Sequence, residues 1–185
     1  MSVITKSSTA AAKPKNKSER IRIYVDKATL HDVSGIHSVL LANKRDSQLY
    51  QRSRADIQRN LRDFYVATDE KGKLMGCVAI HFHTPTYAEI LSLAVAPGCQ
   101  GKGIGPRLLE QAENAALERH AETIWLICQK PEYFERLGFK RISPFKLPTS
   151  MLMKKFRETL DQPFSRWLPN LLGRMKFMIM LPRKT

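Results

Sequence analysis

Hydrophobic positions follow two periods along the chain, and these periods predict where strands and helices lie. In residues 21–25 apolar and polar side chains alternate, which is typical of a strand with one buried face. Between 30 and 41 apolar side chains recur every three or four residues, and this spacing predicts a helix. A second helix is expected over 53–61, with Ser53 as its N-cap, because serine is favoured at the position before a helix.

Three strand-like segments occupy the middle of the chain, at 64–68, 73–82 and 87–95. Short turn sequences join them, at 69–72 and at 84–86. Turns of this length connect antiparallel neighbours, so the expected unit is an antiparallel meander.

Elements of both kinds are predicted after residue 96. They are a helix over 106–119, an apolar strand over 123–128, a short helix over 131–137 with Gly138 as its stop, and strands over 139–143 and 175–181. Three prolines, Pro148, Pro163 and Pro169, are expected to divide 147–174 into short pieces, because proline interrupts regular elements.

Charge is distributed unevenly over the 185 residues. The formal net charge is +14, and it divides into +4 over 1–20, +1 over 21–139 and +9 over 140–185. The middle of the chain is therefore nearly neutral, which disfavours a domain that coats nucleic acid. The first 20 residues are small, polar and lysine-rich, so they are expected to form a flexible basic tail. A transit peptide is the alternative, although no amphipathic arginine face supports it.

Several other classes of protein are disfavoured. The longest stretch without charge, 74–88, is shorter than a membrane span and contains two histidines. The chain has three cysteines, no Cys-x-x-Cys pair and no apolar leader, so a reducing, cytoplasmic location is expected. His81 and His83 would share one face of a strand without a neighbouring cysteine ligand, so no metal site is expected.

The most informative chemistry lies where the third meander strand ends. Gly101, Gly103 and Gly105 alternate there, immediately before the helix predicted over 106–119. Glycines let backbone N–H groups converge, and a helix start adds unpaired N–H groups with partial positive charge, so the segment is suited to phosphate oxygens. Lys102 can add a charge-assisted contact. A nucleotide P-loop would need a hydroxyl residue after the lysine, and a dinucleotide site would need Gly-x-Gly-x-x-Gly in a parallel sheet, which leaves a coenzyme A pyrophosphate site.

Two motifs resemble those of the GNAT superfamily of N-acetyltransferases. The run LAVAPGCQGKGIGPRLL is similar to its acyl-CoA motif Gln/Arg-x-x-Gly-x-Gly/Ala, with Gln100, Gly103 and Gly105 at those positions. YFERLGFKR resembles the later motif, a short helix that ends in Gly-Phe. The resemblance covers residues 21 to about 143. It implies an α/β (α+β) fold with a mixed, mostly antiparallel sheet flanked by helices, as a single domain over 21–185 whose sheet is completed by the basic segment 140–185.

The resemblance also implies acetyl-CoA as co-substrate and no metal. Leu93, Ala94 and Val95 would pair through their backbones with the pantetheine arm, as an added strand would. The pyrophosphate would be held by Gln100, Gly101, Lys102, Gly103, Ile104 and Gly105.

A narrower likeness is to the acetyltransferase domain of bacterial N-acetylglutamate synthases, which acetylate the α-amino group of glutamate in the first step of arginine biosynthesis. The segments YAEILSLAVAP, NLRDFYVA and PEYFERLGF carry it. Arg52 and Ser53 fall on a family segment that contacts the substrate carboxylates, and the alternative for Arg52 is a solvated side chain at a helix start. A protein amine or another small amine remains an alternative substrate. A non-catalytic module that docks through its basic ends is a second alternative, and a homodimer is left open.

The catalytic residues implied by the resemblance are a general base and a general acid. Glu89 would be the base, acting through a water, and the alternative is a strand carboxylate paired to a lysine. The tyrosine that serves as acid in relatives falls on Phe134 here, so the acid is Tyr133, water or no group at all. Cys128 is expected to be a small packed side chain and not a nucleophile.

Overall fold

The structure of the chain, a computed structural model, describes residues 22–43, 52–160 and 176–181. The strands within these residues form one mixed sheet in the order β1-β2-β3-β4-β5-β7-β6. All neighbours pair antiparallel except β4 and β5, which are parallel. The strands are β1 (Tyr24–Lys27), β2 (Phe64–Thr68), β3 (Leu74–Thr84), β4 (Tyr87–Val95), β5 (Thr123–Cys128), β6 (Lys140–Ile142) and β7 (Lys176–Met180).

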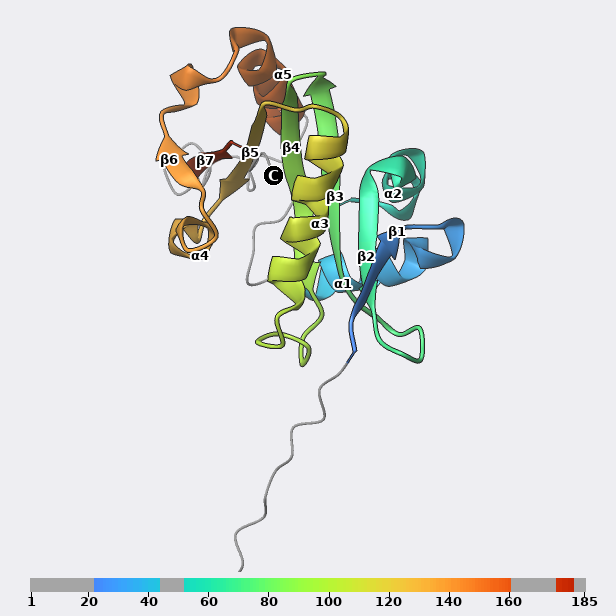
Figure 1. The fold of residues 1–185 in the computed structure, drawn as a ribbon. Helices are drawn as coiled ribbons and strands as arrows, with labels where there is room; N and C mark the ends of the chain where they lie inside the picture. The colour runs from blue at the N-terminus through green and yellow to red at the C-terminus, as the bar shows by residue number, and fades with distance from the viewer. Residues whose placement is uncertain (1–21, 44–51, 161–175, 182–185) are drawn as a thin grey trace, which may run out of the picture.

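Helices cover both faces of this sheet (Figure 1). They are α1 (Val33–Ala42), α2 (Arg54–Arg59), α3 (Ile104–Glu118), α4 (Pro131–Glu135) and α5 (Thr149–Leu160). The helix α3 packs on one face of the central strands, whereas α1 and α2 pack on the other. The two-residue alternation of β2 and β3 explains this, because Val66 and Cys77 join the α1 core while Tyr65 and Val78 join the α3 core.

Close packing between α3 and β3 depends on one glycine. A Cβ atom at Gly76 would lie 2.9 Å from the Ala94 backbone oxygen and 3.0 Å from Leu108 Cδ1. Leu108 is fully buried, so neither neighbour has space to move. Glycine therefore sets the distance between the helix and the strand from which the site is built.

Most elements predicted from the periodicity are present, with shifted ends. The helix predicted over 106–119 begins at Ile104, because Gly103 takes a left-handed conformation and serves as the N-cap. The last strand, predicted over 175–181, is β7 over Lys176–Met180 and lies inside the sheet between β5 and β6.

One expectation was wrong. The segment that follows Pro148 was expected to be cut into short pieces, yet Thr149–Leu160 forms the helix α5. Proline is tolerated at a helix start because the N–H it lacks has no partner within the helix at that point. Pro163, Pro169 and the basic tail over 1–20 lie outside the described residues.

Candidate active site

The parallel strands β4 and β5 pair over a short length and then separate. Their paired residues run from Tyr87 opposite Thr123 to Glu89 opposite Trp125. Beyond Glu89 none of the described strands pairs with this edge of β4, although the other edge stays paired with β3 as far as Val95. Figure 1 shows β5 beginning beside β4 and pointing away from it toward β7. An edge of β4 with available backbone groups therefore faces the space between the strands.

A β-bulge in β4 accompanies this separation. The register with β3 shifts between Cys77, opposite Ala94, and Ala79, opposite Leu91, so β4 carries one extra residue there. Ser92 lies in the bulge with a φ of 53°, a conformation that non-glycine residues seldom adopt. Bulges redirect a strand and increase its twist, which accounts for the altered course of β4 away from β5.

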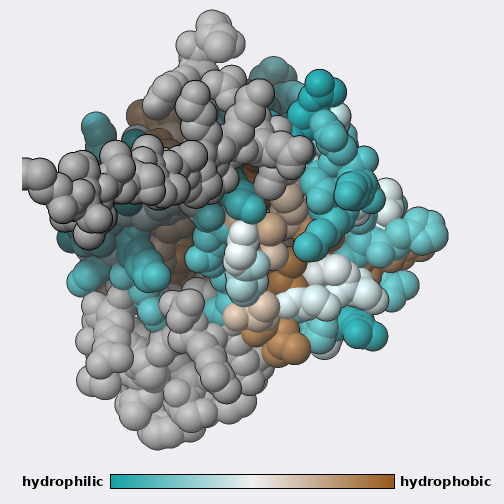
Figure 2. Space-filling model, turned by 90° about the horizontal axis from the view of Figure 1, so that it is seen from below, coloured by the Kyte–Doolittle hydropathy of each residue, from teal (hydrophilic) through white to brown (hydrophobic). Residues whose placement is uncertain are grey.

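The glycine turn follows β4 and leads into α3. Gly98, Gly101 and Gly103 all have φ between 77° and 80°, and a Cβ at any of them would meet no atom within 4 Å. Their conformation, not lack of space, therefore requires glycine. Figure 2 looks onto this end of the molecule and shows apolar and near-neutral surface across the middle, with hydrophilic residues around it. Gln100 and Lys102 are exposed there, whereas Ile104 and Gly105 are buried at the start of α3.

Asn43, at the end of α1, connects three parts of this region. Its side-chain amide donates to the Val39 oxygen at 2.9 Å and to the Val95 oxygen at 3.0 Å. Its own oxygen accepts from Gln100 Nε2 at 3.4 Å. Because Asn43 is buried, it fixes the end of β4 relative to α1 and to the first residue of the predicted phosphate motif.

Glu89 lies where β4 and β5 part. It is 1% exposed, and its Oε2 atom is 2.7 Å from His83 Nε2. His83 lies at the end of β3, and its side chain is 4% exposed. A buried carboxylate at the base of the separated strands can accept a proton from a group placed between them.

Tyr133 and Phe134 are adjacent on α4, with their rings edge to face and centroids 5.1 Å apart, and each has a different further contact. A Cβ at Gly105 would lie 2.5 Å from Tyr133 Oη, so the hydroxyl reaches the first turn of α3. Phe134 instead packs edge to face against Phe139, with 5.8 Å between ring centroids. Burial raises the pKa of Tyr133, with Arg136 nearby lowering it by less, so the phenol keeps its proton at neutral pH.

Arg52 and Ser53 make contacts within the protein. Arg52 Nε donates to Ser92 Oγ at 3.1 Å, and Nη1 forms an ion pair with Asp56 Oδ2 at 3.0 Å. The Arg52 side chain is 13% exposed, so it is not the solvated arginine considered as an alternative. Ser53 is the N-cap of α2, as predicted, and its Oγ accepts from the Asp56 backbone N–H at 3.1 Å.

Residues 32–139 match the Acetyltransferase (GNAT) family. The chain is a GNAT acetyltransferase. An uncharacterised N-acetyltransferase of Chlorobaculum tepidum is 36% identical over 124 residues, which are 67% of this chain and 79% of that one. The amino-acid acetyltransferase of Mycobacterium tuberculosis is 25% identical over 169 residues, 86% of this chain and 95% of the relative.

A solved structure shares the fold of this GNAT acetyltransferase. It is the N-acetylglutamate synthase of Neisseria gonorrhoeae complexed with coenzyme A and N-acetyl-glutamate, with a TM-score of 0.71 and 22% identity. The alignment covers 88% of this chain and 36% of that one. The predicted family, the GNAT fold, the acetyltransferase class and acetyl-CoA as acetyl donor are thereby confirmed.

Other functional groups are sparse in the GNAT domain described here. Burial raises the pKa of the Cys77 thiol to about 12 and that of Cys128 to about 11, so neither forms much of the nucleophilic thiolate at neutral pH. Among the described residues, no three histidine, cysteine, aspartate or glutamate side chains are grouped as metal ligands. None of the described helices has the length and apolar character needed to cross a membrane.

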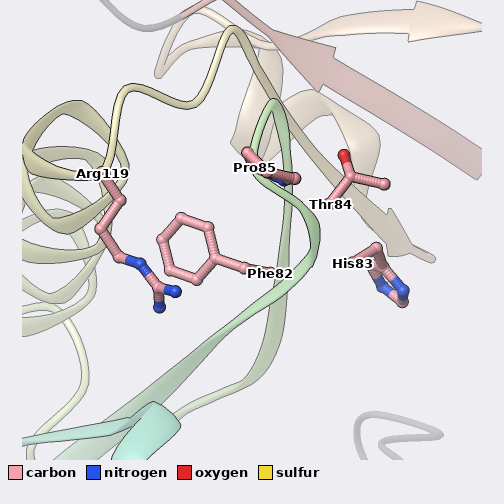
Figure 3. A pocket seen from close by; sticks show the side chains of 5 residues that line it. All are labelled: Phe82, His83, Thr84, Pro85 and Arg119. Carbon is pink, nitrogen blue, oxygen red and sulfur yellow. The ribbon is translucent and has the colours of Figure 1, made fainter.

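A hollow of about 330 Å³ lies at the opposite end of β4 from the glycine turn. Phe82, His83, Thr84 and Pro85 line it together with Arg119 from the end of α3 (Figure 3). The Arg119 guanidinium lies 3.8 Å from the centroid of the Phe82 ring, whereas the His83 ring points away from both. His83 therefore lines the hollow while its ring is directed away from the stacked Arg119 and Phe82.

The contact of His83 with Glu89 was not predicted from the sequence. In the sequence, two histidines two residues apart share a predicted strand face, a pattern that bears on metal binding and not on a carboxylate partner. The pairing with β4 slips by one residue between Phe82, opposite Ala88, and Thr84, opposite Tyr87, which leaves His83 as the extra residue of a bulge. A bulge cannot be placed from alternation alone, so no sequence signal identified the pair.

Proposed function

We propose that this GNAT acetyltransferase transfers the acetyl group of acetyl-CoA to the α-amino group of an amino acid, with glutamate as the preferred acceptor. The position of Glu89 carries the proposal. It is the last β4 residue paired with β5, so its carboxylate lies beside the edge that a pantetheine arm would join. The proposal is further supported by the relative from Mycobacterium tuberculosis, which is named an amino-acid acetyltransferase, and by the structural neighbour complexed with N-acetyl-glutamate.

Coenzyme A would bind along β4 and the glycine turn. Leu93, Ala94 and Val95 would pair with the pantetheine arm through backbone groups on the edge that faces β5. The turn from Gln100 to Gly105 would hold the pyrophosphate on backbone N–H groups at the start of α3, with Lys102 adding positive charge. This arrangement would place the thioester near the base of the separated strands.

The acceptor would enter as an ammonium ion and lose a proton to Glu89, directly or through a water. The electron pair left on nitrogen then attacks the thioester carbonyl carbon, forming the C–N bond as the C–S bond breaks. Nitrogen gives up its second proton, the departing thiolate gains one, and one proton per turnover leaves the site. Tyr133 is the side-chain candidate for the proton donor, because its pKa is raised by burial and its hydroxyl lies at the start of α3.

Arg52 is the candidate contact for an acceptor carboxylate. It lies on the α2 side of the sheet, where its hydrogen bond to Ser92 brings it within three residues of Glu89 along β4. Three residues of a strand span roughly 10 Å, a distance that the acceptor and the long Arg52 side chain would bridge together. Ser53, next to it, caps α2 and would support the position of Arg52.

The acceptor is tested by thiol release from acetyl-CoA with a panel of amines. The panel contains glutamate, neutral and basic amino acids, polyamines and lysine-bearing peptides. We expect the highest kcat/KM with glutamate. Turnover of another amine, with glutamate no faster than hydrolysis in water, would refute this choice of acceptor. Arginine biosynthesis and a cytoplasmic location, both expected from the resemblance and composition, remain predictions.

The base is tested with Glu89→Gln. We expect kcat to fall by about 10²- to 10⁴-fold and the pH profile to change, because the amide cannot accept the proton. Coenzyme A affinity, measured by calorimetry, should stay within about twofold, since the backbone contacts remain. Glu110→Gln is the control, because Glu110 is exposed on α3 and should leave both quantities unchanged. An unaltered pH profile for Glu89→Gln would exclude Glu89 as the base.

A further inference from the structure

The pair formed by His83 and Glu89 is buried on both sides of the contact. The side chains are 4% and 1% exposed, and 2.7 Å separates Nε2 from Oε2. Placing two ionisable groups in a protein interior is unfavourable compared with apolar packing of the same volume. The buried pair therefore lowers the stability of the folded protein. Pairs of this kind are found at sites where protons are transferred.

The second nitrogen of His83 provides an independent observation. Nδ1 is buried and has no hydrogen-bond partner among the described residues. A buried polar atom without a partner destabilises the folded state, and such atoms are few in native proteins. A carboxylate oxygen only accepts hydrogen bonds, so Nε2 carries the hydrogen in this contact and holds the carboxylate as its donor.

The backbone aims His83 at the carboxylate. Glu89 lies directly opposite His81 in the pairing of β3 and β4, so regular alternation would put His81 nearest to it. The bulge at His83 changes the direction of that side chain, and His81 pairs instead with Asp63, at 2.8 Å. The bulge thus selects which histidine contacts Glu89.

Aromatic rings and a second histidine–carboxylate contact lie next to the pair. On β3 the His81 ring lies edge-on to the His83 ring, with centroids 4.9 Å apart, and Asp63 holds the far side of His81. On β5 the Trp125 ring lies 5.5 Å from the His83 ring, and Phe177 of β7 stacks on that tryptophan. His83 therefore contacts the carboxylate of Glu89, whereas His81 contacts that of Asp63.

We propose that His83 is a positioning residue for the general base Glu89. Its Nε2 atom holds Oε2 and so orients the carboxylate toward the space between β4 and β5. When Glu89 takes a proton from the acceptor ammonium on its other oxygen, the Nε2–H group keeps its bond to Oε2 at 2.7 Å, and the proton then passes from Glu89 to solvent. This inference rests on the proposed function, in which Glu89 is the base.

The experiment compares three variants of the full chain. His83→Phe fills the space of the ring but offers no nitrogen, whereas His83→Gln keeps an N–H group that can reach Glu89. His81→Gln is the matched control, because it changes the neighbouring histidine on the same strand face and breaks the pair with Asp63 instead. For each, kcat, KM and the pH profile of kcat are measured with the acceptor found by the amine panel.

We expect His83→Phe to lower kcat by about 10- to 100-fold, the range typical of residues that orient a reacting group, while KM for acetyl-CoA stays within about twofold. Its pH profile should also shift, which a purely structural role would not cause. His83→Gln should recover most of the rate, and His81→Gln should stay within about threefold of the parent protein. A His83→Phe protein with the parent kcat and pH profile would overturn the inference.

A second measurement does not depend on activity. The imidazole ¹⁵N signals of His83 are followed against pH in the parent protein and in Glu89→Gln. We expect the Nε2 signal of His83 to differ between the two proteins, because its partner changes from a carboxylate to a neutral amide, and identical signals would show that Nε2 does not contact residue 89. If the parent protein acetylates no amine, the proposed function itself fails. If the parent protein is active and replacing His83 leaves that activity unchanged, only the role of His83 is refuted.

Discussion

The missing side chain at Gly105 lets the Tyr133 hydroxyl lie against the first turn of α3. A Cβ atom there would be 2.5 Å from Tyr133 Oη, which is shorter than any ordinary contact, and 4.0 Å from Val95 Cγ2. The same glycine falls in the motif that resembles the acyl-CoA signature. Its lack of a side chain is therefore required by the tyrosine and, if the proposed phosphate site is correct, by the ligand as well.

These requirements can be separated with a double-mutant cycle. Gly105→Ala should lower the melting temperature, because the tyrosine must move away from α3. Tyr133→Phe removes the atom in conflict, so the double variant should regain part of the loss, with a coupling of about 0.5–3 kcal/mol. Thermal unfolding of the four proteins measures this coupling. Strictly additive effects would mean that the hydroxyl and Gly105 are not in contact.

Some residues of the candidate site could be predicted from the sequence alone. The turn at Gly101 and Gly103 was recognisable because a positive φ favours glycine, whereas the role of Lys102 toward phosphate stays a prediction. The contact of His83 with Glu89 left no such trace, because a one-residue bulge between Phe82 and Thr84 produces it. Bulges arise from pairing between strands, which no local pattern records.

At the level of helices and strands, the side-chain amide of Asn43 links α1 to the glycine turn. Asn43 bonds the Val95 oxygen at the end of β4 and accepts from Gln100. The helix thereby limits the positions available to the turn that would receive pyrophosphate. Preorganised binding loops lose less entropy when a ligand arrives, so this contact should contribute to affinity.

We expect Asn43→Ala to destabilise the protein by about 1–3 kcal/mol, because the buried amide of Asn43 and its bonds to the Val39 and Val95 oxygens are lost. It should also weaken coenzyme A binding, since Gln100 loses its contact with α1. Asn60→Ala is the control, because Asn60 donates a comparable bond to the Asp56 oxygen within α2, away from the glycine turn. Chemical denaturation and calorimetric titration give the two quantities. Equal coenzyme A affinity in both variants would contradict the assigned role of Asn43.

The observed helices and strands agree with the sequence prediction where local chemistry determines their ends, and they differ from it elsewhere. Ser53 caps α2 as predicted, because the bond to Asp56 is local. The helix α5 was missed, since proline was read as an interruption although Pro148 stands just before the helix start. The strand β7 was predicted, but its place between β5 and β6 depends on pairing across distant parts of the chain.

In the whole molecule, β7 joins the strands β5 and β6, which form the part of the sheet that diverges from β4. It pairs with β5 on one side and with β6 on the other. Met178, at its centre, is fully buried in the α3 core, and Phe177 stacks on Trp125. The spacing between β4 and β5 therefore relies on a strand that contributes no candidate site residue of its own.

Met178→Ala should destabilise the protein by about 2–5 kcal/mol, as expected for a buried methionine replaced by alanine. Lys176→Ala, on the same strand but exposed, should change stability by less than about 0.5 kcal/mol. Denaturant unfolding followed by tryptophan fluorescence reports both, since Trp125 packs beside this strand. Similar midpoints for the two variants would mean that β7 does not support the core.

The interior place of β7 also bears on how the protein is made. During synthesis β5 and β6 emerge first, and each exposes an unpaired edge until Lys176–Met180 has left the ribosome. Exposed edges readily pair with other chains, so this interval is when the nascent protein is most prone to aggregate. A chain released from the ribosome between α5 and β7 would lack the strand that joins β5 to β6, so this part of the sheet could not form. Expression yield should therefore depend on translation speed over the segment between these two elements.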